Sequence, residues 1–518
     1  MNRVLVKKTG RVIESIPSMD SIKPYILVGR KANLMIKYFL VIILLFGTGF
    51  SYSQSQTSLQ HFINHPALKH ASVGVSVVEL ESGKSIMTHD VEKSLTPAST
   101  LKLLTTATVL ETFGDNYRYK TEVALDADDP SRILVFGAGD PTLGSDAFGE
   151  NRNAFFINSA NAIGKVLPKE KEYTIYVVDN LFGYDGIAPG WTWIDMGNYY
   201  AAGAYGISIF DNSYRLFFNT TDRNGCARIL RTEPEIKGLT MRSLLSLNNS
   251  GQDNGYIYGA PFSYDREVRG NIPAGRTEFS IKGDIPDPGL LLGQTLADYL
   301  SHSGFKIAKV KTARDDYLSR DCETDRRDVT YHAGKVIFTQ VSRPLKDIIR
   351  EVNVESNNHY TEHLIRTLGR YSKDDIYTDP LEAGIEYVEE FWKARGISTS
   401  SLLMYDGCGL APQDAISAQL LTDLLVYMYN NSEYSSVFFN SLPKAGQEGT
   451  VRSFLRDTKL NGRVFVKSGS IGGVQCFAGY LINGNKKYAF SVMVNKFNST
   501  RPQIRDAIER FLLSLEGN

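Results

Sequence analysis

Ser99 and Lys102 stand three positions apart in the segment Ser-Thr-Leu-Lys, at the start of a predicted helix. Residues three apart share one face of a helix, so this hydroxyl and this amine can meet directly. A serine hydroxyl is a poor nucleophile unless a base removes its proton. A lysine with the ordinary pKa of about 10.4 is protonated at neutral pH, whereas burial and a second cation would lower that pKa. The pair therefore predicts acyl transfer, with Ser99 as nucleophile and Lys102 as its base.

A second polar motif, Ser356-Asn357-Asn358, lies inside a segment with helical periodicity. The hydroxyl of Ser356 can relay a proton between the nucleophile and a leaving group. The amide of Asn358 can form hydrogen bonds with a substrate amide. We therefore expect Ser356 to be catalytic and Asn358 to bind substrate.

A third motif begins at Lys467, on a predicted strand over residues 463–471. The positive charge of Lys467 and the hydroxyl of Ser468 suit a substrate carboxylate. Gly469 has no Cβ and lets another backbone approach closely. The N–H groups of Ser470 and Ser99 could together form an oxyanion hole.

Each motif also occurs by chance elsewhere in the chain. The further matches are Ser441–Lys444, Ser159–Asn161, Ser246–Asn248 and Lys8–Gly10. Pro443 disfavours a helix at the first of these, and Lys8 lies upstream of a predicted export segment. For any single match, a helix-start serine or a solvated lysine is the simpler interpretation. The order of the three motifs, at a helix start, in a helical segment and on a strand, indicates one shared site.

The elements that must position these motifs alternate between strands and helices at both ends of the chain. Predicted strands cover residues 71–80, 463–467, 477–482 and 489–495, and predicted helices cover 98–113, 345–368, 380–396, 418–429 and 502–515. The stretch 116–334 carries short strand-like runs with turns rich in Gly, Asp and Pro, which favours a mostly β insertion. The pattern predicts an α/β domain, residues 57–115 plus 335–518, interrupted by a β-rich accessory region over 116–334.

Residues 35–53 combine a positive start, an apolar stretch and small residues at Ser51 and Ser53. This pattern is typical of a signal peptide, and the stretch is short for a permanent span of about 20 residues. Met35 would then be the initiator, and residues 1–34 would be a doubtful extension. The alternative is a translated extension followed by an uncleaved anchor. Either way we expect a periplasmic or otherwise extracytoplasmic protein, with peripheral membrane association left open.

The composition argues against nucleic acid as the main partner of this protein. The chain has 57 basic and 57 acidic side chains, and nucleic-acid binding rests on a basic excess. The four cysteines, Cys226, Cys322, Cys408 and Cys476, form no metal-binding spacing. A Cys226–Cys322 disulfide is the alternative to the interpretation that we prefer, in which all four are small buried apolar residues.

Taken in order, the three motifs resemble those of the penicillin-recognising serine enzymes. The flanking segments resemble the D-alanyl-D-alanine carboxypeptidases of the S13 peptidase type, the low-molecular-mass class C penicillin-binding proteins. The segments that carry this resemblance are 95–103, 139–143, 189–193, 197–202, 406–410, 442–446, 449–450, 467–470 and 479–480. The interval between Ser99 and Ser356 leaves room for the large insertion of this family. Two departures are Ser468 in place of the usual threonine and Cys408 in place of the serine between two glycines.

The resemblance implies a transpeptidase-like domain, an antiparallel sheet with helices, and an enzyme that acts on peptidoglycan stem peptides. Ser99 would attack the carbonyl between two terminal D-alanines and form an acyl-enzyme that water hydrolyses. Cleavage of peptide cross-links is a second implied activity, and β-lactams would acylate the same serine as inhibitors. No metal and no organic cofactor is implied. The alternatives are a β-lactamase or esterase with the same chemistry, and a non-catalytic cell-wall protein that binds penicillin.

Overall fold

The computed structural model describes residues 57–222, 225–319, 331–375 and 378–515. The predicted signal segment, 35–53, and the extension before it lie outside the described residues. Within the ranges described, no helix combines the length and the apolar character needed to cross a membrane.

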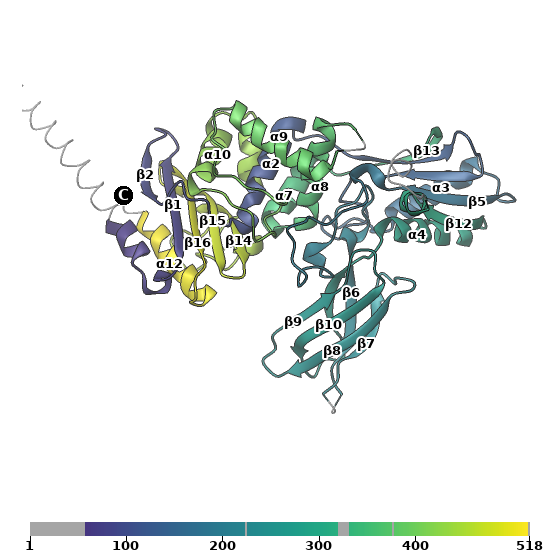
Figure 1. The fold of residues 1–518 in the computed structure, drawn as a ribbon, viewed down its shortest axis with the longest axis horizontal. Helices are drawn as coiled ribbons and strands as arrows, with labels where there is room; N and C mark the ends of the chain where they lie inside the picture. The colour runs from purple at the N-terminus through teal and green to yellow at the C-terminus, as the bar shows by residue number, and fades with distance from the viewer. Residues whose placement is uncertain (1–56, 223–224, 320–330, 376–377, 516–518) are drawn as a thin grey trace, which may run out of the picture. The chain divides into compact units, whose positions relative to one another are not determined.

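Strands from both ends of the chain form one five-stranded antiparallel sheet (Figure 1). In spatial order its strands are β14 (Val464–Ile471), β15 (Val474–Asn483), β16 (Lys486–Asn495), β1 (Ser72–Glu79) and β2 (Ser85–His89). Successive side chains of a strand point to opposite faces, so the sheet can bury an apolar cluster on each face. One cluster includes side chains of α12 (Arg501–Ser514). The strand β14 lies at the edge of the sheet. Residues 443–445 pair with the outer side of its first half, so an added chain could pair only with its second half, where Gly469 and Ser470 lie.

The other face of this sheet is covered by helices from two separate stretches of sequence. These are α2 (Lys102–Phe113), α7 (Leu345–Glu355), α8 (Asn358–Ser372), α9 (Pro380–Ala394), α10 (Ala418–Asn430) and α11 (Ser435–Ser441). The helices α8 and α9 pack closely because glycines face each other. A Cβ on Gly369 would lie 1.9 Å from the carbonyl oxygen of Pro380, and a Cβ on Gly384 would lie 2.2 Å from that of Ile365.

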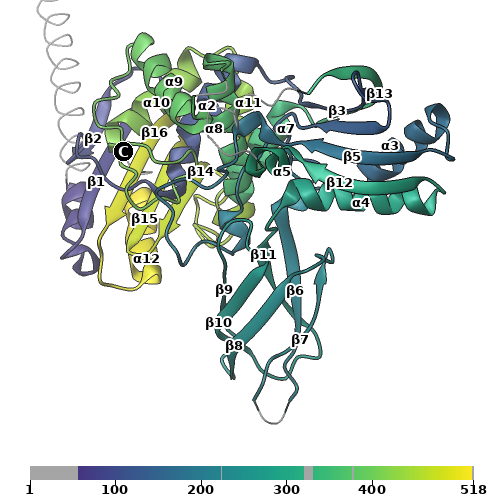
Figure 2. The ribbon, with the colours of Figure 1, turned by 45° about the vertical axis from the view of Figure 1, so that its right-hand side comes forward.

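The chain between α2 and α7 forms three further sheets (Figure 2). The largest has the order β12 (Lys306–Thr312), β5 (Glu172–Val178), β4 (Arg132–Phe136), β3 (Lys120–Asp126) and β13 (Ala333–Val341). One smaller sheet has the order β8 (Thr240–Asn248), β10 (Asp265–Pro273), β9 (Asn254–Tyr258). The other has the order β11 (Phe279–Asp284), β6 (Ser213–Asn219), β7 (Arg228–Glu233).

The predicted α/β class, with an antiparallel sheet and covering helices, is confirmed. The stretch 116–334 is rich in strands, β3 to β12, as expected, but it is not β alone. This stretch contains α3 (Ala154–Val166), α4 (Pro288–His302) and α5 (Ala313–Leu318). The pairs β4–β5 and β5–β12 are parallel, and parallel neighbours need long crossover connections, here with helices. The boundary expected at residue 334 falls inside β13, which pairs with β3, so this sheet extends to Val341.

The cysteines differ in their environments. Cys408 and Cys476 are buried, whereas Cys226 is exposed in the connection between β6 and β7, so the prediction that all four are buried is wrong. Cys322, which would be the disulfide partner of Cys226, lies outside the described residues.

Candidate active site

Ser99 lies in a 3₁₀ turn, η2 (Ala98–Leu101), directly before α2. The single helix expected over 98–113 is therefore divided, and Lys102 is the first residue of its α-helical part. Ala98 has a φ of 46°, an uncommon backbone conformation for a residue with a side chain. The Lys102 ammonium donates a hydrogen bond to Ser99 Oγ at 3.0 Å. The three-residue spacing thus brings the two groups together across one turn.

Lys102 is fully buried, and two other acceptors surround its Nζ atom. It donates to Asn358 Oδ1 and to the carbonyl oxygen of Cys408, both at 2.6 Å. Burial lowers the pKa of Lys102 from its ordinary value, partly opposed by Cys408, Asp406 and other nearby acidic groups that favour the charged form. The lysine is therefore held in one position in an environment that favours loss of its proton.

Ser356 marks a break between two helices where the sequence predicted one continuous helix over 345–368. It caps α7 with a left-handed backbone, φ 60° and ψ 39°, and the side chain of Asn357 then caps α8 by accepting from the N–H of Tyr360 at 3.0 Å. Serine and asparagine favour such caps because their side chains bond to nearby backbone groups. The break turns the side chains of Ser356 and Asn358 toward the other two motifs.

Asn358 connects Lys102 to the inserted region. Its Oδ1 accepts from Lys102, and its Nδ2 donates to the carbonyl oxygen of Tyr200 at 2.8 Å. Tyr200 belongs to η4 (Tyr199–Ala201), within the signature at 197–202. These two partners determine which way the amide faces, because the first is a donor and the second an acceptor.

Lys467 is buried on β14, and its ammonium donates to Ser356 Oγ at 2.9 Å and to the carbonyl oxygen of Ser468 at 3.0 Å. Burial lowers the pKa of Lys467 well below its usual value, the nearby charge of Lys102 lowers it further, and Glu355 opposes the shift. The hydroxyl of Ser468 lies 2.8 Å from Thr450 Oγ1. The contact between Lys467 and Ser356 therefore joins the third motif to the second.

Gly469 lets β14 pack against η2, the turn that carries Ser99. A Cβ at this position would lie 2.4 Å from the carbonyl oxygen of Pro97 and 3.0 Å from the nitrogen of Ser99. Real Cβ atoms do not come so close to backbone, so a side chain here would push β14 away from Ser99. The next residue, Ser470, is exposed at the open edge of the sheet.

Asp406 organises a buried loop to which sequence reasoning gave no role. Its carboxylate accepts from the N–H groups of Cys408, Gly409, Leu410 and Ala411 at 2.6–2.9 Å, and from Trp191 Nε1 at 2.8 Å. The loop presents the Cys408 carbonyl to Lys102. At Gly409, φ is 76° and a Cβ would lie 2.0 Å from the carbonyl oxygen of Ala98. The segment Asp406-Gly-Cys-Gly409, a carboxylate with two glycines after it, could have indicated such a loop from the sequence.

The thiol of Cys408, which stands where the family usually has a serine, contacts the Asp406 carboxylate. Its Sγ lies 3.5 Å from Asp406 Oδ2, and the ligand atoms of Glu362, Asp406 and Cys408 lie within 4.8 Å of one another. Hydrogen bonds already occupy these oxygens, since Glu362 accepts from Arg366 at 2.7 Å and from the N–H of Gly407 at 2.8 Å. The cluster is thus satisfied by protein donors and serves to hold the loop.

Two buried histidines behind Asn358 tie α8 to the signature at 139–143. His363 Nδ1 donates to the carbonyl oxygen of Gly139 at 2.9 Å, so its Nε2 is the acceptor when the ring is neutral. Ser208 Oγ lies 2.8 Å from His363 Nε2 and 3.0 Å from His359 Nε2. Burial lowers the pKa of His359 to about 3 and that of His363 well below its ordinary value. Both rings are neutral and act as structural links.

The chance matches to the motifs lie in ordinary structural positions. Ser441 Oγ donates to the carbonyl oxygen of Phe438 at 2.6 Å and is 2.9 Å from Asn353 Nδ2, while the Lys444 ammonium lies over the Phe465 ring. Ser159 is buried in α3, and Ser246 lies on β8. Lys8 lies outside the described residues.

Two cavities meet at Ser99. One, of about 670 Å³, is bounded by β14, β15 and α12, and the other, of about 900 Å³, is also lined by parts of the inserted region such as Asp146, Tyr199 and Lys282. Four residues line both cavities: Ser99, Ser356, Ser470 and Arg501. Ser99, the predicted nucleophile, therefore borders a cavity on each of two sides.

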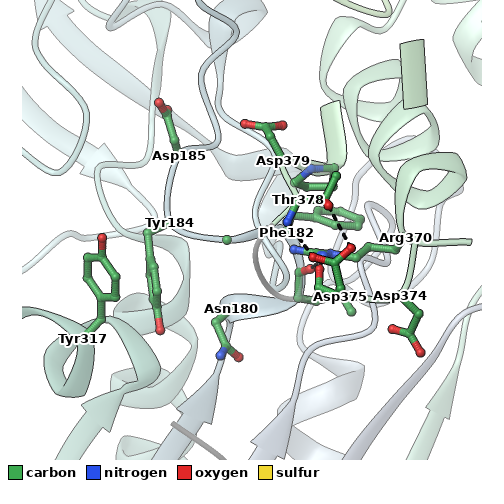
Figure 3. Close-up of a pocket in the computed structure, with 13 residues that line it drawn as sticks. Asn180, Phe182, Tyr184, Asp185, Tyr317, Arg370, Asp374, Asp375, Thr378 and Asp379 are labelled. Atoms are coloured by element: carbon green, nitrogen blue, oxygen red, sulfur yellow. Dashed lines mark hydrogen bonds between the residues drawn. The ribbon is translucent and has the colours of Figure 1, made fainter. Parts of the chain in front are cut away.

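A separate cavity of about 510 Å³ lies beside η3 (Asn180–Phe182) and the end of α8 (Figure 3). Its wall carries Arg370 and the carboxylates of Asp185, Asp374, Asp375 and Asp379. Arg370 Nε donates to the carbonyl oxygen of Leu181 at 2.6 Å, so this guanidinium holds two segments together. None of the site residues predicted from the sequence lines this cavity.

Comparison with known proteins gives the same assignment as the motifs. The chain matches the model of the D-Ala-D-Ala carboxypeptidase 3 (S13) family over residues 55–515. It is 24% identical over 495 residues to a D-alanyl-D-alanine carboxypeptidase of Actinomadura sp. (strain R39), a match that covers 91% of this chain and 86% of that protein. It is 23% identical over 448 residues to penicillin-sensitive carboxypeptidase A of Dictyostelium discoideum, covering 82% of each.

The fold is similar to that of penicillin binding protein 4 from Haemophilus influenzae. The TM-score to its crystal structure is 0.71, with 17% sequence identity, and the match covers 88% of this chain and 98% of that one. The family resemblance predicted from the motifs is confirmed, since the family model matches most of the chain. The chain belongs to the D-Ala-D-Ala carboxypeptidase 3 (S13) family of peptidases.

Proposed function

We propose that this protein is a serine-type D-Ala-D-Ala carboxypeptidase, a D,D-endopeptidase, or both, and that it acts on peptidoglycan stem peptides through an acyl-enzyme on Ser99. The observation that carries the proposal is the 3.0 Å contact between Lys102 Nζ and Ser99 Oγ in a buried setting. Family membership and the carboxypeptidase names of the two relatives support this choice of substrate.

The partners of Lys102 favour its action as a base. A neutral amine has two hydrogens and one lone pair. Asn358 Oδ1 and the Cys408 carbonyl oxygen can only accept hydrogen bonds, so they take the two hydrogens. The lone pair then faces Ser99 Oγ and can receive its proton as the serine attacks the peptide carbonyl.

Ser356 and Lys467 suit the second proton transfer. When the C–N bond of the substrate breaks, the departing amine needs a proton. The Ser356 hydroxyl can donate one and recover another from the Lys467 ammonium, 2.9 Å away. In the hydrolytic half of the cycle water attacks the ester, and its proton can pass through Ser356 to Lys467, which gave one up in the first half. Lys102, now protonated, can return a proton to Ser99 as the ester breaks.

The open edge of β14 suits a peptide substrate. An extended peptide can pair with an edge strand, and Asn358, Ser468 and Gly469 border the position that it would occupy. The N–H groups of Ser99 and Ser470 are the donors that we assign to the oxyanion. The hydroxyl of Ser468 would lie near the substrate carboxylate, whereas Lys467, which is fully buried, would act through Ser356.

Labelling with a fluorescent penicillin tests the proposal. The wild type is expected to form a covalent adduct at Ser99 and to release D-alanine from a peptide ending in D-Ala-D-Ala. Ser99→Ala is expected to lose both, whereas Ser441→Ala, in the chance motif, should keep both. Full labelling of Ser99→Ala would contradict the proposal. Slow loss of the label supports a penicillin-sensitive peptidase, and rapid hydrolysis would support the β-lactamase alternative.

The pH dependence of acylation follows from the lowered pKa of Lys102. The base must be neutral, so the acylation rate constant should rise with pH through the pKa of Lys102 and then level off. Because burial lowers that pKa, the midpoint of the rise should lie below pH 10.5. Stopped-flow acylation over a pH series measures this. A rate that still rises in proportion to hydroxide at pH 10.5 would exclude a buried lysine as the base.

We also propose that residues 35–53 direct export, so that the catalytic region works outside the cytoplasm, where peptidoglycan is found. Mass spectrometry of the N-terminus in the cell-envelope fraction tests this. Cleavage close to Ser53 is expected, and an intact N-terminal extension on cytoplasmic protein would contradict it. Retention in washed membranes would instead support an uncleaved anchor.

A further inference from the structure

The cleft contains one exposed arginine that the motifs did not indicate. Arg501 is the first residue of α12 and lines both cavities at Ser99, together with Ser356 and Ser470. A capping box between Thr500 and Gln503 holds this end of the helix in place. The guanidinium is therefore presented beside the end of β14 by a firmly positioned helix.

Most N–H groups of the Arg501 guanidinium are available to bind a ligand. Nη2 donates to the carbonyl oxygen of Ile471 at 3.1 Å, and among the described residues no carboxylate forms an ion pair with it. Arg505, on the next turn, is instead engaged by Glu509 at 3.0 Å and by Ser453 at 2.9 Å. The contact with Ile471 fixes one side of the Arg501 fork and leaves its remaining N–H groups for a ligand.

The two lysines of the site are poorly placed to supply this charge. Lys102 and Lys467 are both fully buried, and their ammonium groups donate to protein acceptors. Lys282, another cation at the cleft, lines only the larger cavity and lies over the Tyr199 ring. Arg501 is thus the exposed cation common to both sides of the nucleophile.

We propose that Arg501 binds the α-carboxylate of the amino acid that leaves during acylation, and so selects peptides with a free carboxylate next to the scissile bond. A planar guanidinium matches a carboxylate in a two-point contact, and this contact is stronger than a neutral hydrogen bond. Ser468 would contribute a hydroxyl to the same carboxylate. This inference rests on the proposed function, and it assigns to Arg501 the charge that the sequence pattern assigned to Lys467.

The test compares an acyl-L-Lys-D-Ala-D-Ala peptide with its C-terminal amide. In the wild type, kcat/KM should be higher for the free acid. In Arg501→Ala, kcat/KM for the acid should fall by about 10- to 100-fold, the range for lost hydrogen bonds to a charged group, while the value for the amide stays nearly constant. Arg501→Lys should recover part of the preference. Arg510→Ala, on an exposed arginine of the same helix that pairs with Asp506, should behave as wild type.

The outcomes separate the two proposals. An unchanged ratio of acid to amide in Arg501→Ala, with normal penicillin labelling, would overturn the role of Arg501 and leave the peptidase function standing. Equal losses for the acid and the amide would also overturn it, because a general defect is not carboxylate recognition. A wild type that cleaves neither peptide and forms no penicillin adduct would overturn the proposed function, and this inference with it.

Discussion

Lys102→Met is expected to slow acylation of Ser99 by about 10³- to 10⁴-fold, because methionine fills a similar volume but cannot accept the serine proton. The change also removes the donor for two buried acceptors, Asn358 Oδ1 and the Cys408 carbonyl oxygen. Each unsatisfied acceptor should cost about 1–3 kcal/mol of folding stability, so the melting temperature should fall while the fold is kept. Stopped-flow acylation by a fluorescent penicillin and thermal denaturation by circular dichroism measure the two effects.

The chance motif offers a matched control for this variant. Lys444 has the same spacing from Ser441 that Lys102 has from Ser99, and it lies over the Phe465 ring. Lys444→Met should leave the acylation rate within about twofold of wild type, since it touches no catalytic group. If Lys102→Met acylates as fast as Lys444→Met, the base must be another residue.

Asp406→Asn is expected to be severely destabilising, by about 3–5 kcal/mol, and to reduce acylation as well. Asparagine keeps the shape but replaces one carboxylate oxygen with an N–H₂ group, which would face backbone N–H groups that now donate to it. Loss of a charged buried acceptor leaves these donors unsatisfied. The loop would then no longer hold the Cys408 carbonyl against Lys102. Chemical denaturation and penicillin acylation measure both effects.

Asp414→Asn is the matched control, with the same chemical change in the same buried region. Burial and the neighbouring Asp406 raise the pKa of Asp414 well above its ordinary value, which favours the neutral form of this carboxyl. Asparagine can still accept from the N–H of Tyr405, as Asp414 does at 2.7 Å. We expect a loss below about 1 kcal/mol and near-normal acylation. Equal effects of the two variants would show that Asp406 acts by volume and not by its charge.

The inserted region takes part in the site through two of the signatures seen in the sequence. Trp191, in the segment 189–193, donates to Asp406, and Tyr200, in the segment 197–202, accepts from Asn358. Gly139, in the segment 139–143, accepts from His363 on α8. The sequence marked these segments as family features, and in the structure they form hydrogen bonds with the elements that carry the predicted catalytic groups.

The sequence by itself determined the family, the α/β class and the residues at which to look. The Ser99–Lys102 pair is local, since a three-residue spacing on one helical turn brings the two side chains together whatever the rest of the chain does. Gly469 was also identified from the sequence, because a residue without a Cβ lets another backbone approach closely. The sequence did not show that this backbone is the turn at Pro97–Thr100. Sequence reasoning missed features that depend on distant neighbours, such as the helices α3, α4 and α5 of the inserted region and the continuation of its largest sheet to Val341.

Only the tertiary structure decided how the three motifs become one site. The break at Ser356 depends on side-chain caps that compete with a continuing helix, and periodicity alone did not reveal it. The contact between Lys102 and Asn358 joins residues 256 positions apart, and Asp406 acts on Lys102 through a loop from a third part of the chain. The lowered pKa of both lysines also comes from burial by these distant segments. Desolvation depends on how the whole core is assembled. The motif alone could therefore suggest Lys102 as the base, but only the fold shows the burial that lowers its pKa.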